Sequence, residues 1–299
     1  MTTHTPNMQN IVARDLSFGL RFGKVEGRGH RIERGRVMTS IELNHISLII
    51  YRIPVSRVCQ YLPAGTTLDT TSEGGTEMAW LSVLSCIDQG MGGVENTTYR
   101  LHILSEGHPA QLVLGVSLGS LASVGARHLW QLPWHLGAME LQAAYDQTNG
   151  RYSDYRLQTQ SQWDNARWEL SDSGRAIEPQ SLPGMGIPKS VLSTRIKMIF
   201  SRPVSQSSTA GNVGPESLNG HNGETEVVQA DWMMTRAELK VARSEFLERS
   251  GLMTREELAN PVLVGLQAQG TVTLYPLASE RRERSTIIGS PSINIARTN

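Results

Sequence analysis

The chain has 299 residues, of which 39% are hydrophobic and 19% charged, so it carries enough apolar material for the core of one large domain or two small ones. Its 28 basic and 28 acidic residues balance, and a neutral chain has no global field that would attract nucleic acid or an anionic membrane, so we expect neither as a partner. No apolar run approaches the roughly 20 residues that a membrane span needs, and the first ten residues show no pattern of a secretory signal.

Two cysteines, Cys59 and Cys86, are too few for a disulfide framework or a four-cysteine zinc site. We interpret both as small hydrophobic residues in a reducing compartment. The sequence therefore predicts a cytoplasmic protein.

The first 39 residues are polar and rich in glycine and arginine, which predicts a poorly ordered N-terminal arm. Acidic residues stand among its arginines, so RNA binding through the arm is the weakest of the functional hypotheses. Residues 40–280 predict a single barrel domain, interrupted by a flexible loop at 203–226 that is rich in Ser, Gly and Asn. Residues 281–299 predict a C-terminal tail.

Several segments have the pattern of strands. Residues 77–90 (EMAWLSVLSCIDQG) have apolar and small side chains in both alternating sets, which is typical of a strand covered on both faces. Alternation continues in 98–106, and 111–120 indicates another buried strand. The Asn-Gly pair at 149–150, between two alternating runs, predicts a hairpin. Short strands at close spacing predict a mainly β, α+β fold, in which an antiparallel sheet forms a closed or half-closed β-barrel with a few peripheral helices.

Residues 232–251 (WMMTRAELKVARSEFLERSG) carry the strongest helical pattern of the chain. Thr235 is a suitable N-cap, Glu238 completes a capping box, and apolar residues recur at helical spacing until Gly251. We therefore expect a helix here, followed by a last short strand at 272–280.

Four segments in order resemble the motifs of a known family. LPAGTTLDTTSEGGTEMAWLSVL (62–84) resembles its "LP-x-G-x-x-LDT" loop and "AWVSVV" strand, and ENTTYRL (95–101) is similar to its "N-x-x-TYV" strand. Residues 117–139 resemble its "SLDA…GAR-x-x-Y-x-LPY" segment, and VLSTRIKMIF (191–200) resembles its "LTERYRLY". On these motifs the chain, over residues 43–278, resembles the YqjF-like family of uncharacterised conserved proteins.

That family is in turn similar to the acetoacetate-decarboxylase-like fold, a closed or half-closed barrel around a deep pocket. The resemblance implies that GARHLWQLPWHLG (125–137) occupies the place where decarboxylases carry Schiff-base lysines, in a pattern like "GRE-x-x-GFPKK". Arg127 matches the arginine of this pattern, whereas Trp134 and His135 occupy the positions of the two lysines. Because neither residue forms an imine with a keto substrate, the resemblance argues against acetoacetate-type decarboxylation by that route.

This segment supplies the first candidate site. Pro133 predicts a break between a short helix and a strand. We assign catalytic roles to Arg127, whose planar fork suits a carboxylate or enolate oxygen, and to His135, a general base near neutral pH. Trp134 and His128 are candidates for substrate binding. The alternative is structural: an arginine that holds loop carbonyls, a hydrogen-bonded histidine and a tryptophan of the core.

Asn96, Tyr99 and Arg100 form a second group of candidate substrate-binding residues. Arg100 is the choice for anion binding, and the alternative is an ion pair with a neighbouring glutamate. Alternation on a strand puts Arg100 and His102 on one face and Tyr99 on the other.

The sequence contains no HExxH, phosphate loop, nucleophile elbow or dinucleotide fingerprint, so we expect neither a metal nor a cofactor. The first functional hypothesis is a pocket that takes a small organic molecule with a carboxylate or a ketone, in a lyase-type enzyme without imine chemistry. The second is a non-catalytic ligand-binding or interaction module. The sequence leaves open whether the chain forms a homo-oligomer.

Overall fold

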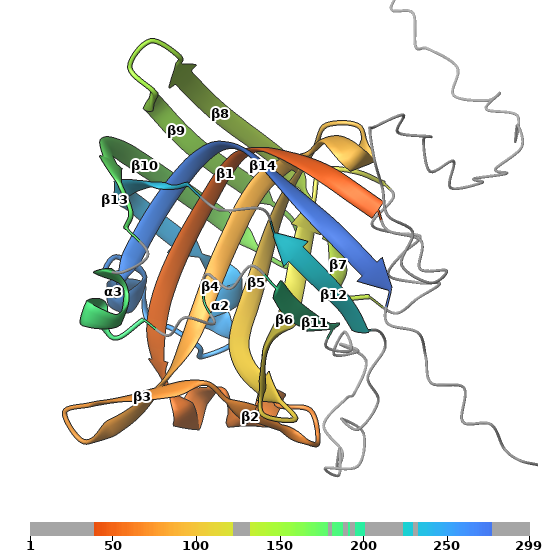
Figure 1. Ribbon diagram of the computed structural model, residues 1–299, viewed down its shortest axis with the longest axis vertical. Coiled ribbons are helices and arrows are strands. Elements are labelled where there is room, and N and C mark those ends of the chain that lie inside the picture. The colour runs from red at the N-terminus through yellow and green to blue at the C-terminus, as the bar shows by residue number, and fades with distance from the viewer. Residues whose placement is uncertain are drawn as a thin grey trace, which may run out of the picture. The chain divides into compact units, whose positions relative to one another are not determined.

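The computed structural model describes residues 39–121, 132–178, 181–187, 191, 195–200, 224–229 and 233–276. The predicted arm, most of the loop at 203–226 and the tail lie outside these residues and stay predictions. Every described strand belongs to one 14-stranded sheet (Figure 1).

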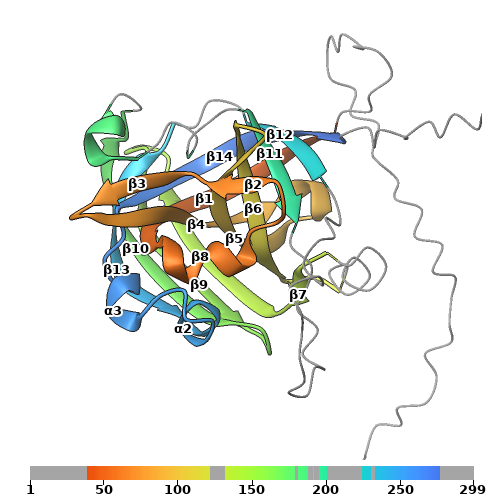
Figure 2. The ribbon, with the colours of Figure 1, turned by 90° about the horizontal axis from the view of Figure 1, so that it is seen from below.

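The strands are β1 (Thr39–Pro54), β2 (Thr66–Leu68), β3 (Thr70–Glu73), β4 (Thr76–Asp88), β5 (Val94–Ser105), β6 (His108–Leu118), β7 (Trp134–Leu136), β8 (Ala138–Asp146), β9 (Arg151–Gln160), β10 (Asn165–Ala176), β11 (Arg195–Phe200), β12 (Glu224–Gln229), β13 (Thr235–Ser244) and β14 (Leu263–Pro276). Two short helices, α2 (Glu245–Arg249) and α3 (Arg255–Leu258), follow β13 and pack beside β10 and β13 (Figure 2). Within the described residues, no helix combines the length and apolar character that a membrane crossing requires.

The strand order is β1-β4-β5-β6-β11-β12-β14-β13-β10-β9-β8, and β1 pairs in addition with β14. At the other end, β8 pairs with β9 alone among the described strands. The sheet as a whole is therefore not closed into a barrel, although the β1–β14 pairing joins β1, β4, β5, β6, β11, β12 and β14 into a ring. It is also mixed, because β6 runs parallel to both β11 and β7. The predicted mainly β class is correct. Of the predicted closed or half-closed barrel, the closed form is wrong, and the sheet predicted as antiparallel is mixed, since pairing between distant segments leaves no local sequence pattern.

β4 and β5 lie between two apolar clusters, which explains why the predicted strand at 77–90 has no polar face. Tyr99 and Leu101 of β5 belong to the cluster that the layer β8–β9–β10 covers, together with Trp168. Trp80 and Leu84 of β4 belong to a second cluster, which includes residues of β1 and β14. We call the two sides of these strands the Tyr99 face and the Arg100 face, after consecutive residues of β5. Candidate residues can meet at one site only if they lie on the same one of these two faces.

The predicted hairpin at Asn149–Gly150 is confirmed and joins β8 to β9. Gly150 has a φ of +63°, which glycine adopts without steric cost. The Asp146 carboxylate accepts hydrogen bonds from the backbone N–H groups of Thr148 and Asn149, at 2.9 and 3.2 Å. Local turn chemistry therefore fixes the register of this edge of the sheet.

The predicted helix at 232–251 is wrong over most of its length, because β13 occupies Thr235–Ser244 and pairs with β10. The N-cap is Ser244, whose hydroxyl accepts a hydrogen bond from the N–H of Leu247, and not Thr235. The same sequence also alternates, since Arg236, Glu238 and Lys240 are exposed and Ala237 is buried. Pairing with β10 therefore outweighs the local helical pattern.

Candidate functional site

Arg100 is a buried cation for which the described residues supply no carboxylate partner. Its side chain is 8% exposed. Its Nη1 donates a hydrogen bond to Gln111 Oε1 at 3.1 Å, and its Nε has no partner within the described residues. None of the ion pairs between described residues includes Arg100, so the alternative of an ion pair with a neighbouring glutamate is wrong for this part of the chain. Burial lowers the pKa of its guanidinium to about 10, and the group stays charged at neutral pH.

His102 and Trp80 lie on the same face as Arg100. His102 is 1% exposed, its Nε2 is 3.0 Å from Ser82 Oγ, and its Nδ1 has no partner in the described part of the chain. The indole Nε1 of Trp80, on the neighbouring strand, likewise has no described partner. Burial and then the Arg100 charge lower the pKa of His102 to about 3, so its imidazole is neutral near pH 7. This face therefore carries the buried Arg100 cation beside two neutral ring systems. A second cation, Arg52, lies 5.9 Å from the Trp80 ring and is paired with Glu73.

Asn96, the third candidate, lies further along the Arg100 face. Its Oδ1 accepts a hydrogen bond from the Cys86 thiol at 3.5 Å, across the pair that the two residues form in the sheet. Burial, and secondarily the charge of Asp88, raises the pKa of Cys86 to about 12. The thiol is thus protonated at neutral pH and acts here as a hydrogen-bond donor, not as a nucleophile.

Tyr99 belongs to a separate, hydrogen-bonded cluster on the opposite face. Its hydroxyl donates to Asp164, a buried carboxyl that the sequence did not single out. Asp164 Oδ1 also accepts from Ser244 Oγ at 3.1 Å and from the Phe246 N–H at 2.9 Å. Burial raises the pKa of Asp164 despite these hydrogen bonds. The cluster holds the start of α2 against β5, so Tyr99 and Arg100 do not meet at one site.

His135 and Trp134 are on β7, which confirms the predicted strand after Pro133. His135 is 6% exposed and stacks on Trp163, with ring centroids 4.2 Å apart. Trp163 in turn contacts the ring of Tyr99, so His135 belongs to the Tyr99 face. Trp134 packs on the other side, against the cluster of Val113, Val116 and Leu118.

The structure thus separates the predicted residues. Arg100 and Asn96 share one face of the sheet, and Tyr99 and His135 share the other. Arg127 and His128 lie outside the described residues, as does the helix predicted before Pro133. The predicted catalytic roles of Arg127 and His135 stay predictions.

The described lysines, Lys197 and Lys240, are not beside Arg100. Lys240 is exposed and pairs with Glu238. The Nζ of Lys197 lies 3.4 Å from Ser105 Oγ, and Lys197 alternates along β11 with Met198, which packs with Trp134. No group of three or more His, Cys, Asp or Glu side chains suited to a metal ion occurs among the described residues.

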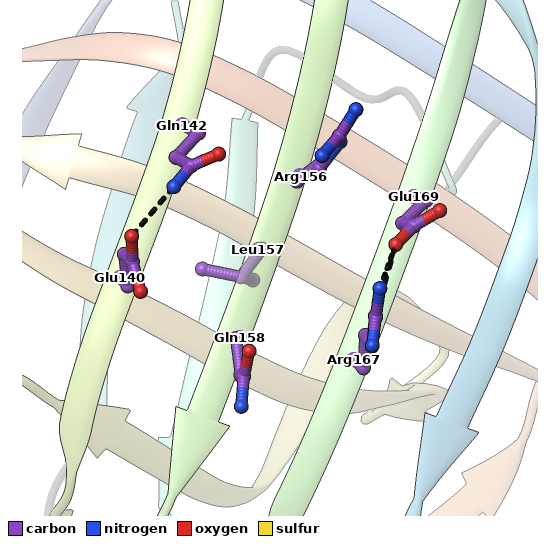
Figure 3. Close-up of a pocket in the computed structure, with 7 residues that line it drawn as sticks. All are labelled: Glu140, Gln142, Arg156, Leu157, Gln158, Arg167 and Glu169. Carbon is purple, nitrogen blue, oxygen red and sulfur yellow. Dashed lines mark hydrogen bonds and ion pairs between the residues drawn. The ribbon is translucent and has the colours of Figure 1, made fainter.

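A shallow depression lies on the outer surface of β8, β9 and β10 (Figure 3). It is lined by Glu140, Gln142, Arg156, Leu157, Gln158, Arg167 and Glu169. Each charged side chain has a partner on its own strand: Gln142 donates to Glu140 at 2.6 Å, Arg156 pairs with Asp154 at 3.0 Å, and Arg167 pairs with Glu169. The two arginine charges are compensated by ion pairs and Glu140 is hydrogen-bonded to a neutral amide, so the depression has the character of a solvated sheet surface.

Comparisons with known proteins match one family model, and several solved structures are similar at low identity. The model of the DUF2071 family, described as "Uncharacterized conserved protein (COG2071)", matches residues 40–269. No curated protein matches the sequence. The structure is similar to that of acetoacetate decarboxylase from Legionella pneumophila subsp. pneumophila str. Philadelphia 1, at 11% identity over 89% of this chain and 96% of that chain, with a TM-score of 0.49.

Two further solved structures are similar. An acetoacetate decarboxylase-like enzyme from Sphingomonas wittichii RW1 has 11% identity over 80% of this chain and 90% of that chain, with a TM-score of 0.45. The enduracididine biosynthesis enzyme MppR has 12% identity over 79% of this chain and 84% of that chain, with a TM-score of 0.44.

Proposed function

We propose that the chain, which belongs to the DUF2071 family of uncharacterized conserved proteins, binds a small organic molecule through a carboxylate that pairs with Arg100. The observation that carries the proposal is the buried guanidinium of Arg100, whose one described side-chain partner is the neutral amide of Gln111. A buried charge without a counter-charge costs several kcal/mol, and a bound anion offsets that cost. A carboxylate matches the planar N–H fork of an arginine.

The neighbours of Arg100 favour a ligand that also carries a carbonyl or carboxyl oxygen. The indole N–H of Trp80 is a donor and has no described partner. The Nδ1 of His102 can donate a hydrogen bond in one of its two neutral tautomers. The amide of Gln111 already accepts from Arg100, so its N–H groups remain as donors. These hydrogen-bond donors, together with the Arg100 guanidinium, suit a keto acid or another carboxylated molecule.

The finer proposal, a lyase-type reaction on such a molecule without an imine, needs an acid–base group that faces the ligand. His102 has a pKa of about 3 and accepts a proton poorly at neutral pH. The Cys86 thiol, with a pKa of about 12, is no more suitable. His135 belongs to the opposite face of the sheet. These observations favour the non-catalytic alternative, a ligand-binding module, over the enzyme.

Isothermal titration with pyruvate, acetoacetate and neutral acetone tests the binding proposal. We expect the wild-type chain to bind the two acids and not acetone. Arg100→Gln should weaken binding at least about tenfold, since truncating one partner of a buried charge pair costs about 2–5 kcal/mol. Arg167→Gln, which removes an exposed arginine, is the matched control and should bind normally. Absence of binding, or equal binding by Arg100→Gln, would overturn the proposal.

Proton NMR on the acetoacetate sample distinguishes an enzyme from a binding module. A module leaves acetoacetate unchanged beyond its spontaneous decay, whereas a lyase produces acetone at a rate proportional to protein concentration. Borohydride added with pyruvate should leave the chain mass unchanged, because no described lysine lies beside Arg100.

A further inference from the structure

We propose that two copies of this chain associate through the free edge of β8, so that the two β8 strands pair antiparallel and the sheet continues from one copy into the other. The proposal is independent of the ligand proposed at Arg100. It rests on the length of this edge, on incomplete burial beside it and on the charges that self-pairing brings together.

Among the described strands, β8 is the longest that pairs with only one neighbour. It has nine residues, Ala138–Asp146, and pairs on one side with β9. The other described strands that pair with one neighbour are β2, β3 and β7, with three, four and three residues. β13 pairs with β14 at Thr235 and Arg236 only, but α3 packs against it. Natural proteins protect edges by shortening them or by placing lysine or proline on them, because unpaired N–H and C=O groups recruit another strand. β8 contains neither lysine nor proline.

Burial is incomplete along β8. Met139, Leu141 and Ala143 point toward the core and pack against its apolar cluster, yet each remains partly exposed. The β9 residues directly opposite them, Thr159, Leu157 and Tyr155, are fully buried. The difference arises from position, because β9 has a strand on both sides and β8 on one. A strand added to β8 would cover these three side chains.

The charges of β8 favour a second copy as the added strand. Antiparallel pairing about a two-fold axis at Gln142 engages all nine residues and places Glu140 opposite Ala144 of the second copy. Leu141 then faces Ala143 of the second copy, and Gln142 faces its own equivalent. No like charges are opposed in this register, whereas a register centred on Glu140 would oppose two carboxylates. The interface is isologous, as a two-fold dimer requires.

Analytical ultracentrifugation over a range of protein concentrations tests the proposal, and we expect wild-type protein to sediment as a dimer at the upper end. Gln142→Asp and Gln142→Lys each oppose like charges at the two-fold axis. Each should raise the dimer dissociation constant at least about fivefold, since directly opposed like charges destabilise a strand pair. An equimolar mixture of the two variants should regain association, because Asp and Lys then face each other.

Gln160→Asp is the matched control, because Gln160 is an exposed glutamine on β9 that lies opposite the uncharged Ala138 and Asn165 and has no place at the edge. It should sediment as wild type does. Hydrogen exchange gives an independent readout, because β8 amides should become better protected as concentration rises. A wild-type monomer at all concentrations, or a Gln142→Asp variant that dimerises as strongly as wild type, would overturn the proposal. Circular dichroism establishes that each variant is folded.

Discussion

The Asp164 cluster on the Tyr99 face of β5 and the polar residues around Arg100 on the other face differ in how completely their hydrogen bonds are satisfied, although the indole N–H of Trp168, also on the Tyr99 face, has no described partner. On the Tyr99 face, the Asp164 carboxyl accepts from Tyr99, Ser244 and the Phe246 backbone, so donors and acceptor are matched. On the Arg100 face, nitrogens of Arg100, His102 and Trp80 have no partner among the described residues. A matched buried cluster contributes to the fold, whereas unmatched buried donors reduce stability and indicate a ligand. The following substitutions test this difference, in order of decreasing effect.

Asp164→Ala should have the largest effect, because it leaves three donors on the Tyr99 face without an acceptor. We expect the free energy of unfolding to fall by about 3–5 kcal/mol, measured by urea denaturation. Asp154→Ala, which removes an exposed carboxylate paired with Arg156, is the control and should change stability little. A loss below about 1 kcal/mol for Asp164→Ala would mean that the Tyr99 face is not the structural one.

Arg100→Met should change the free energy of unfolding in the opposite direction, in protein without ligand. Replacing a buried, unmatched cation by an apolar side chain of similar length should raise the free energy of unfolding by about 1–3 kcal/mol. The same denaturation experiment measures the change. A destabilisation comparable to that of Asp164→Ala would show that the charge and hydrogen bonds of Arg100 are already satisfied within the chain. The contrast between the two faces would then disappear.

The acid sensitivity of the Arg100 face provides a third test. The folded pKa of His102 is about 3, below its ordinary value of 6.5. Below pH 6.5 the unfolded chain binds a proton that the folded chain does not, so stability is lost as pH falls from 6.5 toward 3, by up to about 1.4 kcal/mol per pH unit.

His102→Gln removes this titration and should flatten the loss of stability between neutral pH and about pH 5, seen in urea denaturation at each pH. Equal slopes for the variant and wild type would mean that His102 titrates alike in the folded and unfolded chain.

Arg167→Gln should have the smallest effect. Arg167 is an arginine on a strand, as Arg100 is, but it is exposed and paired with Glu169. Removing one partner of an exposed pair should change the free energy of unfolding by less than about 0.5 kcal/mol. A larger effect would show that the depression in Figure 3 does more than face solvent.

Local patterns in the sequence predicted the parts of the fold that depend on neighbouring residues. Alternation predicted that Arg100 and His102 share a face opposite Tyr99, and the Asn149–Gly150 turn predicted the β8–β9 hairpin. The helical pattern gave a wrong prediction at Thr235–Ser244. The same residues fit both a helix and a strand there, and pairing with β10 determines that they form a strand.

The site was harder to predict because its contacts are distant in sequence. Asp164 is 65 residues from Tyr99 and 80 from Ser244, so no spacing rule connects the three. The face on which His135 lies is assigned by its contact with Trp163, which comes from a segment after β9. That no described carboxylate pairs with Arg100 cannot be predicted from a sequence with balanced charge.

The pairing of β1 with β14 has a consequence for how the protein is made. Thr39 of β1 pairs with Leu274 of β14, and the ladder continues to Ile50 and Leu263. A ribosome adds roughly 5–20 residues per second, so β1 waits on the order of 10–50 seconds before this partner emerges. Throughout that interval, the side of β1 that later pairs with β14 can pair with other nascent chains on the same messenger RNA. Nascent protein should therefore depend on chaperones more than its modest size suggests.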